Sequence, residues 1–139
     1  MIGMVVVAHE HIGAEMLRGM EHVLGPQALT AALNIDTDTD IEQAKTALAK
    51  LIRRCDTGDG VLLFADMFGG TPCNLALSCM QESKVEVISG FNLPMLVTAA
   101  TKRQTDSDLS GLARKVRDAG CQYIYLASEL MEQKRQHHA

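Results

Sequence analysis

Short apolar segments alternate with amphipathic helical patterns along this chain, and that alternation restricts its fold more than any other feature. Strands are predicted at residues 2–8, 29–35, 61–65, 85–88 and 122–126. The first of these is continuously apolar, which is typical of a strand buried on both faces of a parallel sheet. Helical spacing of apolar residues fills the intervals between the strands. We therefore predict an α/β fold, a doubly wound and mostly parallel sheet with flanking helices.

Capping signals predict where two of the helices begin. Thr39 and Glu42 stand three positions apart, as in a capping box. Thr71 is expected to be the N-cap of a later helix, with Pro72 at its first position.

Length and composition define the class of protein. The chain has 139 residues, which suits a single domain, expected at residues 1–130, followed by a polar and frayed tail at 131–139. A net charge of −4 and the lack of Trp argue against a nucleic-acid binder. No apolar run is long enough to cross a bilayer, and no signal peptide is evident, so we expect a cytoplasmic protein with no membrane insertion. The four cysteines form no metal-binding or CxxC pattern and are expected to be reduced thiols.

Two polar residues stand where predicted strands end. His9 follows the first strand and Asp66 follows the third. Ligands of open α/β sheets bind beyond the carboxyl ends of the strands, so His9 is a candidate nucleophile or general base. A carboxylate on one ring nitrogen would set the tautomer and make the other nitrogen a better nucleophile. The alternative is that His9 is a polar strand-end residue with a satisfied hydrogen bond.

His9 and His11 form an HxH pair, which raises the question of a metal site. In metal-dependent hydrolases this pair belongs to an eightfold barrel of ~250 residues, far longer than this chain. No third or fourth ligand stands near a predicted strand end. We therefore predict no metal and interpret His11 as a solvated neighbour.

The segment "GGTP" after Asp66 has the features of an anion site. Gly69 and Gly70 allow backbone amides to turn toward a ligand, and the helix start at Thr71 supplies unpaired N–H groups. The same residues are also ordinary turn chemistry before a helix, so both interpretations stay open. Cys73 is interpreted as a packed thiol rather than a reactive one.

Three stretches of the sequence resemble one known family. "VVVAHEHIGAEML", "GVLLFADMFGGTPCNLA" and "VEVISGFNLPMLV" are similar to the EIIA domain of the mannose family of the bacterial sugar phosphotransferase system. The family pattern has a strand ending in His, a strand ending in Asp before a "GG[ST]P.N" loop, and a "G.N.PM" segment. All three occur here in that order, and the resemblance extends over residues 2–126.

The resemblance implies a phosphohistidine relay without a cofactor. His9 would accept a phosphoryl group from the phosphocarrier HPr, and Asp66 would hold one ring nitrogen so that phosphorylation falls on Nε2. The amides of Gly69 and Gly70, with Thr71, would surround the phosphate. A separate EIIB protein would be the acceptor, and family members are homodimers in which a C-terminal strand, here residues 122–126, pairs with the partner's sheet.

The resemblance also suggests the borders of the site. Asn92 and Pro94 match the segment that follows the fourth strand, and Phe68 is expected to be a contact surface for HPr. Two other functions remain open: a regulatory module controlled by its phosphorylation state, and a small metal-dependent hydrolase using His9, His11 and Asp66. The sequence does not name a sugar.

Overall fold

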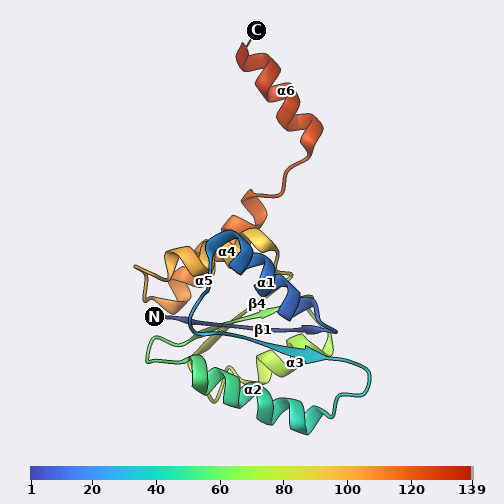
Figure 1. The fold of residues 1–139 in the computed structure, drawn as a ribbon, viewed down its shortest axis with the longest axis vertical. Helices are drawn as coiled ribbons and strands as arrows, with labels where there is room; N and C mark the ends of the chain where they lie inside the picture. Colours follow the sequence, from blue (N-terminus) through green and yellow to red (C-terminus); the bar gives the residue numbers. More distant parts are fainter. Residues whose placement is uncertain (139) are drawn as a thin grey trace.

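Four parallel strands form the sheet at the centre of the protein (Figure 1). The computed structural model describes residues 1–138. The strands are β1 (Gly3–His9), β2 (Thr30–Ile35), β3 (Val61–Ala65) and β4 (Val85–Ser89), in the order β2-β1-β3-β4. The chain moves from β1 to β2 on one side and then to β3 on the other, so the strand order reverses at β1. The predicted α/β class and parallel sheet are confirmed.

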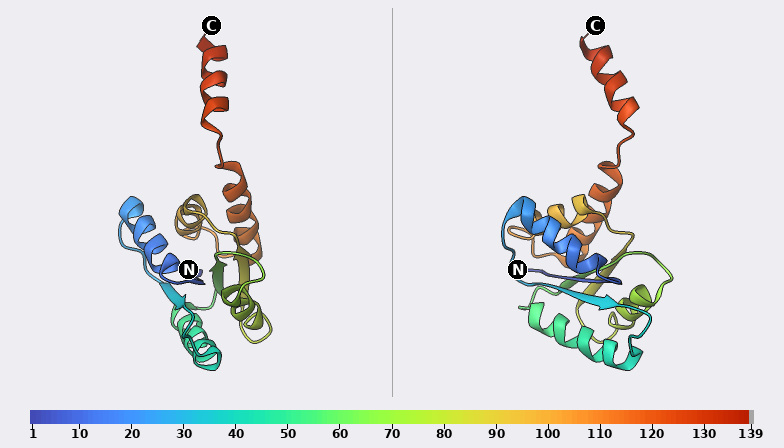
Figure 2. Two further views of the ribbon diagram at one scale, coloured as in Figure 1. Left: turned by 90° about the vertical axis from the view of Figure 1, so that its right-hand side faces the viewer. Right: turned by 45° about the vertical axis from the view of Figure 1, so that its right-hand side comes forward.

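Helices cover both faces of the sheet (Figure 2). One core layer joins α1, α4 and α5 to the sheet, and the other joins α2 and α3 to its opposite face. Alternate residues of β1 divide between the layers, Met4 and Val6 facing the first, Val5 and Val7 the second. The helix bounds are α1 Ile12–Leu24, α2 Ile41–Cys55, α3 Thr71–Ser78, α4 Leu93–Lys102, α5 Leu109–Gln122 and α6 Ala127–His138.

The two central strands are the most buried part of the molecule. Every side chain of β3, and those of β1 from Met4 to Ala8, are fully buried. Burial of each large aliphatic side chain stabilises the fold by about 1.5–3 kcal/mol. This core holds the carboxyl ends of β1 and β3 side by side, since Val7 pairs with Ala65.

Helix α2 begins one residue later than the capping-box pattern predicts. Asp40 is the N-cap, and its side chain accepts hydrogen bonds from the amides of Glu42 at 2.9 Å and Gln43 at 3.3 Å. The Thr39 hydroxyl instead donates to Asp36 and closes the preceding turn. The prediction of Thr39 was wrong because a carboxylate at the next position competes for the same amides.

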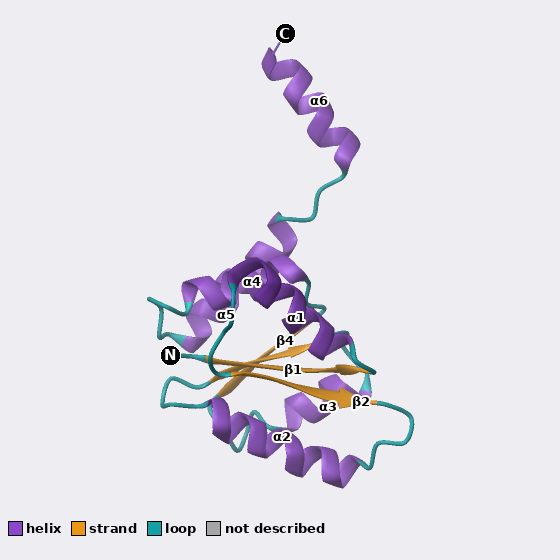
Figure 3. Ribbon diagram, viewed as in Figure 1, coloured by secondary structure: helices purple, strands orange, loops and turns teal. Residues whose placement is uncertain are grey.

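The predicted fifth strand at residues 122–126 is not formed. Helix α5 continues through Gln122, and the following residues extend away from the body before α6 begins (Figures 1 and 3). Most of the tail predicted at 131–139 is helical, because α6 reaches His138; Ala139 lies outside the described residues. A strand requires a neighbour for its backbone hydrogen bonds, and this segment has none within the described chain. The four side chains that follow Gln122 are exposed, at 48% for Tyr123, 73% for Ile124, 57% for Tyr125 and 63% for Leu126.

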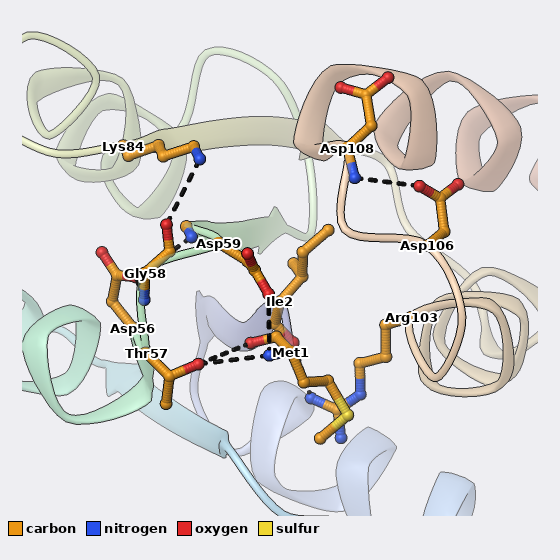
Figure 4. A network of polar contacts seen from close by, with 11 residues as sticks. Met1, Ile2, Asp56, Thr57, Gly58, Asp59, Lys84, Arg103, Asp106 and Asp108 are labelled. Carbon is orange, nitrogen blue, oxygen red and sulfur yellow. Dashed lines mark hydrogen bonds and ion pairs between the residues drawn. The ribbon is translucent and has the colours of Figure 1, made fainter.

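A buried arginine makes hydrogen bonds to the backbone at the end of the sheet opposite to His9. The Arg103 side chain is 2% exposed, and its guanidinium donates to the carbonyls of Ile2 at 3.0 Å and Ala28 at 2.6 Å. Burial lowers the pKa of Arg103 below its usual value. Figure 4 shows this end of the sheet, where the Met1 ammonium also pairs with Asp59 at 2.9 Å.

Candidate functional site

His9 and Asp66 meet at the carboxyl ends of adjacent strands. His9 is the last residue of β1, and Asp66 directly follows β3. The Nδ1 atom of His9 lies 2.8 Å from Oδ2 of Asp66, and the His9 amide donates to the same oxygen at 2.9 Å. The Met67 amide donates to the other carboxylate oxygen at 3.1 Å. The two strand ends that the sequence separates by 57 residues therefore form one polar site.

These bonds keep Asp66 ionised. Burial alone raises the pKa of the Asp66 carboxyl, but the hydrogen bonds from the His9 backbone and ring, and the attraction of that ring, outweigh it, so the pKa lies below its usual value. An ionised carboxylate can only accept, so a neutral His9 carries its proton on Nδ1. Its Nε2 is then the nitrogen with a free lone pair, on a side chain that is 43% exposed.

The glycine loop approaches the His9 ring closely. Gly70 is the N-cap of α3, so Thr71 is the first residue of that helix rather than its cap, and Pro72 follows it. Gly70 has the extended backbone that N-cap residues adopt, and no side-chain hydrogen bond caps this helix. A Cβ added to Gly70 would lie 3.0 Å from Cε1 of His9, tighter than ordinary van der Waals contact. Gly69 has a φ of +89°, a conformation that favours glycine.

A shallow pocket of about 340 Å³ lies beside His9. It joins the ends of β1 and β2 to the starts of α2 and α3. Threonines, acidic residues and two isoleucines line it beside His9, and no Lys or Arg is among its lining residues. They are His9, Glu10, Ile35, Asp36, Thr37, Thr39, Ile41 and Thr71. An anion bound in this pocket would be close to uncharged hydroxyl donors and to the negative charges of Glu10 and Asp36.

Phe68, Asn92 and Pro94 occupy different surroundings. Phe68 is 73% exposed on the loop before α3. Asn92 is the N-cap of α4: its Oδ1 accepts from the Met95 amide, and its Nδ2 donates to the Gly120 carbonyl at 3.1 Å. Pro94 lies in α4 and, like Asn92, is not among the residues that line the His9 pocket. Asn92 therefore joins α4 to α5, and its side chain supports the fold.

The His11 side chain contacts a different residue from the His9 side chain. His11 is the N-cap of α1, and its Nδ1 lies 3.0 Å from Nδ2 of Asn34. It is not among the residues that line the His9 pocket. Within the described part of the chain, no three His, Cys, Asp or Glu side chains are grouped so as to hold a metal ion.

Two pocket residues could not be singled out from the sequence. Glu10 and Asp36 both line the pocket with His9. The "DTDTD" run contains Asp36, but an acidic run before a helix is equally typical of a solvated cap. The register of β2 against β1, in which Ile35 pairs with His9, is what brings that run to the site.

A family model described as "PTS system fructose IIA component", of the EIIA-man family, matches residues 3–117. The chain belongs to the EIIA-man family. Over 124 residues this EIIA-man domain is 32% identical to the mannose-specific EIIAB component of Escherichia coli K12, a match that covers 86% of this chain and 37% of that protein. The chain thus spans little more than a third of the length of such relatives. The family predicted from the three motifs is confirmed.

Solved structures share the fold of this EIIA-man domain. A phosphotransferase system EIIA component from Streptococcus agalactiae is 26% identical, with a TM-score of 0.85 over 93% of this chain and 99% of that one. The mannose/sorbose-specific IIA subunit from Enterococcus faecalis, at 24% identity, superposes with a TM-score of 0.80 over 90% and 93% of the two chains.

No helix in the described residues is both long and apolar enough to cross a membrane.

Proposed function

We propose that this EIIA-man domain relays a phosphoryl group through His9, from HPr to an EIIB protein, in sugar uptake or its regulation. The observation that supports this most directly is the 2.8 Å contact between His9 Nδ1 and Asp66. That contact leaves Nε2 as the nitrogen with a free lone pair, and His9 lines a pocket that contains hydroxyls and carboxylates.

The transfer is an in-line exchange between two nitrogen atoms. The Nε2 lone pair of His9 attacks phosphorus, and the bond from phosphorus to the donor nitrogen breaks, its electron pair returning to the donor. The Nδ1 proton stays on the ring, where ionised Asp66 stabilises the positive charge that phosphorylation leaves on the imidazole. The amides of Gly69 and Gly70 and the start of α3 at Thr71 bind the phosphoryl oxygens. Because no Lys or Arg lines the pocket, the phosphoryl group is held weakly enough to leave again.

The donor docks on exposed apolar side chains around the pocket. Met67 is 56% exposed and Phe68 73%, both on the loop that carries Asp66. Ile12 at the start of α1 and Ile41 at the start of α2 are also exposed, at 45% and 44%. Large apolar side chains gathered at one end of a sheet are typical of an interaction site. We assign HPr to this surface.

The protein functions in the cytoplasm as a homodimer joined through its C-terminal segment. The side chains of residues 123–126 are largely apolar and exposed, and residues 124–126 belong to no helix or strand, so this segment is free to pair with a partner strand. Strand β4 stands at the sheet edge, and residues of β4 and α5 line a groove of about 470 Å³, with Arg114, Arg117 and Glu86 in its lining. Addition of the segment from a second copy to an open edge would satisfy both sets of backbone groups.

Phosphorylation in a defined system tests the proposal. The wild-type protein, incubated with phosphoenolpyruvate, enzyme I and HPr, is expected to gain one acid-labile phosphoryl group. His9→Ala should not be labelled, whereas His11→Ala, the matched control two residues away, should be labelled normally. Labelling of His9→Ala would contradict the site. Subsequent transfer to an EIIB protein distinguishes a transport relay from a module controlled by its own phosphorylation.

A further inference from the structure

Glu10 occupies an unusual backbone position immediately after His9. Its φ is +51°, in the left-handed region that residues with a Cβ seldom adopt. The Glu10 amide donates to the Ile35 carbonyl at 2.8 Å, and the chain then turns into α1. Glycine would adopt this conformation without strain, so the backbone by itself gives no reason for a glutamate.

Glu10 is among the residues that line the same pocket as His9. It is exposed, and it takes part in none of the ion pairs found among the described residues. Asp36, across the pocket, accepts from the Asp38 amide at 2.9 Å and from the Thr39 hydroxyl at 3.0 Å, which holds its carboxylate in place. Two carboxylates therefore border the pocket, and its lining contains no Lys or Arg.

We propose that Glu10 sets the phosphoryl-transfer potential of His9: its carboxylate repels the phosphoryl group on Nε2 and so favours return of that group to a partner. The inference rests on the proposed transfer to His9. Phosphorylation adds negative charge to a pocket that has two acidic residues in its lining, and repulsion between like charges raises the energy of the product. Glu10 acts on the phosphoryl group by repulsion and takes no part in forming or breaking bonds.

Glu10 is a better subject for this test than Asp36. The Asp36 carboxylate holds a turn together, so its removal would also change the backbone. Glu10→Gln removes one negative charge and keeps the shape of the side chain. Glu82→Gln makes the same change of charge on an exposed residue beyond the C-terminal end of α3, whereas the N-terminal end of that helix faces His9.

The quantity to be measured is the equilibrium constant for phosphoryl transfer from phosphorylated HPr to this protein. Purified phospho-HPr, freed of enzyme I, is mixed with each variant, and the phosphorylated fractions are read by phosphate-affinity electrophoresis. At low ionic strength, Glu10→Gln should shift the equilibrium toward phosphorylated His9 by about 2- to 5-fold. At high salt, where exposed charges are screened, the shift should disappear, and Glu82→Gln should match the wild type at both salt concentrations.

The possible failures are distinguishable. A wild-type protein that HPr does not phosphorylate would overturn the proposed function and this inference with it. A normally phosphorylated wild type with an unchanged Glu10→Gln equilibrium would overturn the inference alone. A shift of equal size at high salt, or in Glu82→Gln, would also overturn it, because repulsion near His9 would not be the cause.

Discussion

The backbone of Gly70 lies so close to the His9 imidazole that a Cβ there would stand 3.0 Å from Cε1 and 3.5 Å from Nε2. His9 is thus held from two directions. Asp66 bonds its Nδ1, and the glycine loop limits the position of its other side. A small addition to that loop should move the nucleophilic nitrogen without unfolding the protein.

Gly70→Ala should slow phosphorylation of His9 about 10-fold or more, because displacement of a nucleophile by a fraction of an ångström lowers the rate steeply. The measurement is the initial rate of labelling from phospho-HPr. Gly19→Ala is the control, since a Cβ at Gly19 meets only Leu93 at 3.8 Å. That control should keep the normal rate and raise the free energy of unfolding by about 0.5–1 kcal/mol, as expected for Gly→Ala within a helix. A normal rate in Gly70→Ala would show that the ring tolerates the contact.

Asp66→Asn should reduce phosphorylation at least about 10-fold, because an amide does not fix the Nδ1 proton of His9 or stabilise the charged ring as a carboxylate does. It should also lower the free energy of unfolding at pH 7 by about 1.5–3 kcal/mol, the value typical of hydrogen bonds to charged groups.

The pH dependence of that stability difference has a definite sign. The folded-state pKa of Asp66 lies below its usual value, so the stabilisation is complete above the unfolded-state pKa of about 3.9. It is lost as the pH falls through the lower folded-state pKa. Urea unfolding of wild type and Asp66→Asn should therefore differ at pH 7 and converge in strong acid. A difference that persists there would mean that the carboxylate charge is not its source.

Arg103→Met should lower the free energy of unfolding by about 2–4 kcal/mol, because the buried carbonyl of Ile2 and the partly buried carbonyl of Ala28 lose their Arg103 donor. Lys102→Met, on the neighbouring exposed position, should change it by less than about 0.5 kcal/mol. Urea unfolding measures both. His9 in the folded fraction of each variant should be phosphorylated at the normal rate, since Arg103 lies at the opposite end of the sheet; a slower rate would refute this separation.

Ile124→Asp should convert the proposed dimer to a monomer, because a charge on the exchanged segment would have to be buried in the partner. Light scattering during size-exclusion chromatography gives the mass of each species. Val23→Asp is the matched control: Val23 is also β-branched and is 58% exposed on α1, outside the C-terminal segment. A wild type that is monomeric at high concentration would refute the dimer.

Much of this protein follows from local sequence patterns. Continuous apolar runs predict the two central strands, β1 and β3, because a central strand of a helix-covered parallel sheet is buried on both faces. Shorter apolar segments that include polar residues predict β2 and β4. His9 and Asp66 could be proposed as a site from their positions after two such strands, since all parallel strands end at the same edge. The three motifs together were also sufficient to indicate the family.

Other features depend on contacts between distant segments. The strand order brings His9 against Asp66, and the β1–β2 register brings Asp36 to the pocket with Glu10. Spacing along the chain by itself predicts neither the contact between His9 and Asp66 nor the position of Asp36 at the pocket. The role of Arg103 was likewise invisible, because its hydrogen-bond partners lie more than 70 residues away.

Residues 122–126 show where local sequence patterns stop being sufficient and contacts between distant segments decide the structure. Their apolar composition by itself predicts a strand, yet α5 takes Gln122 and the remaining residues lie exposed. Hydrophobic pattern determines which segments are suited to a sheet. Only tertiary structure decides whether a neighbouring strand is present, because the hydrogen bonds of a strand are all made to another segment.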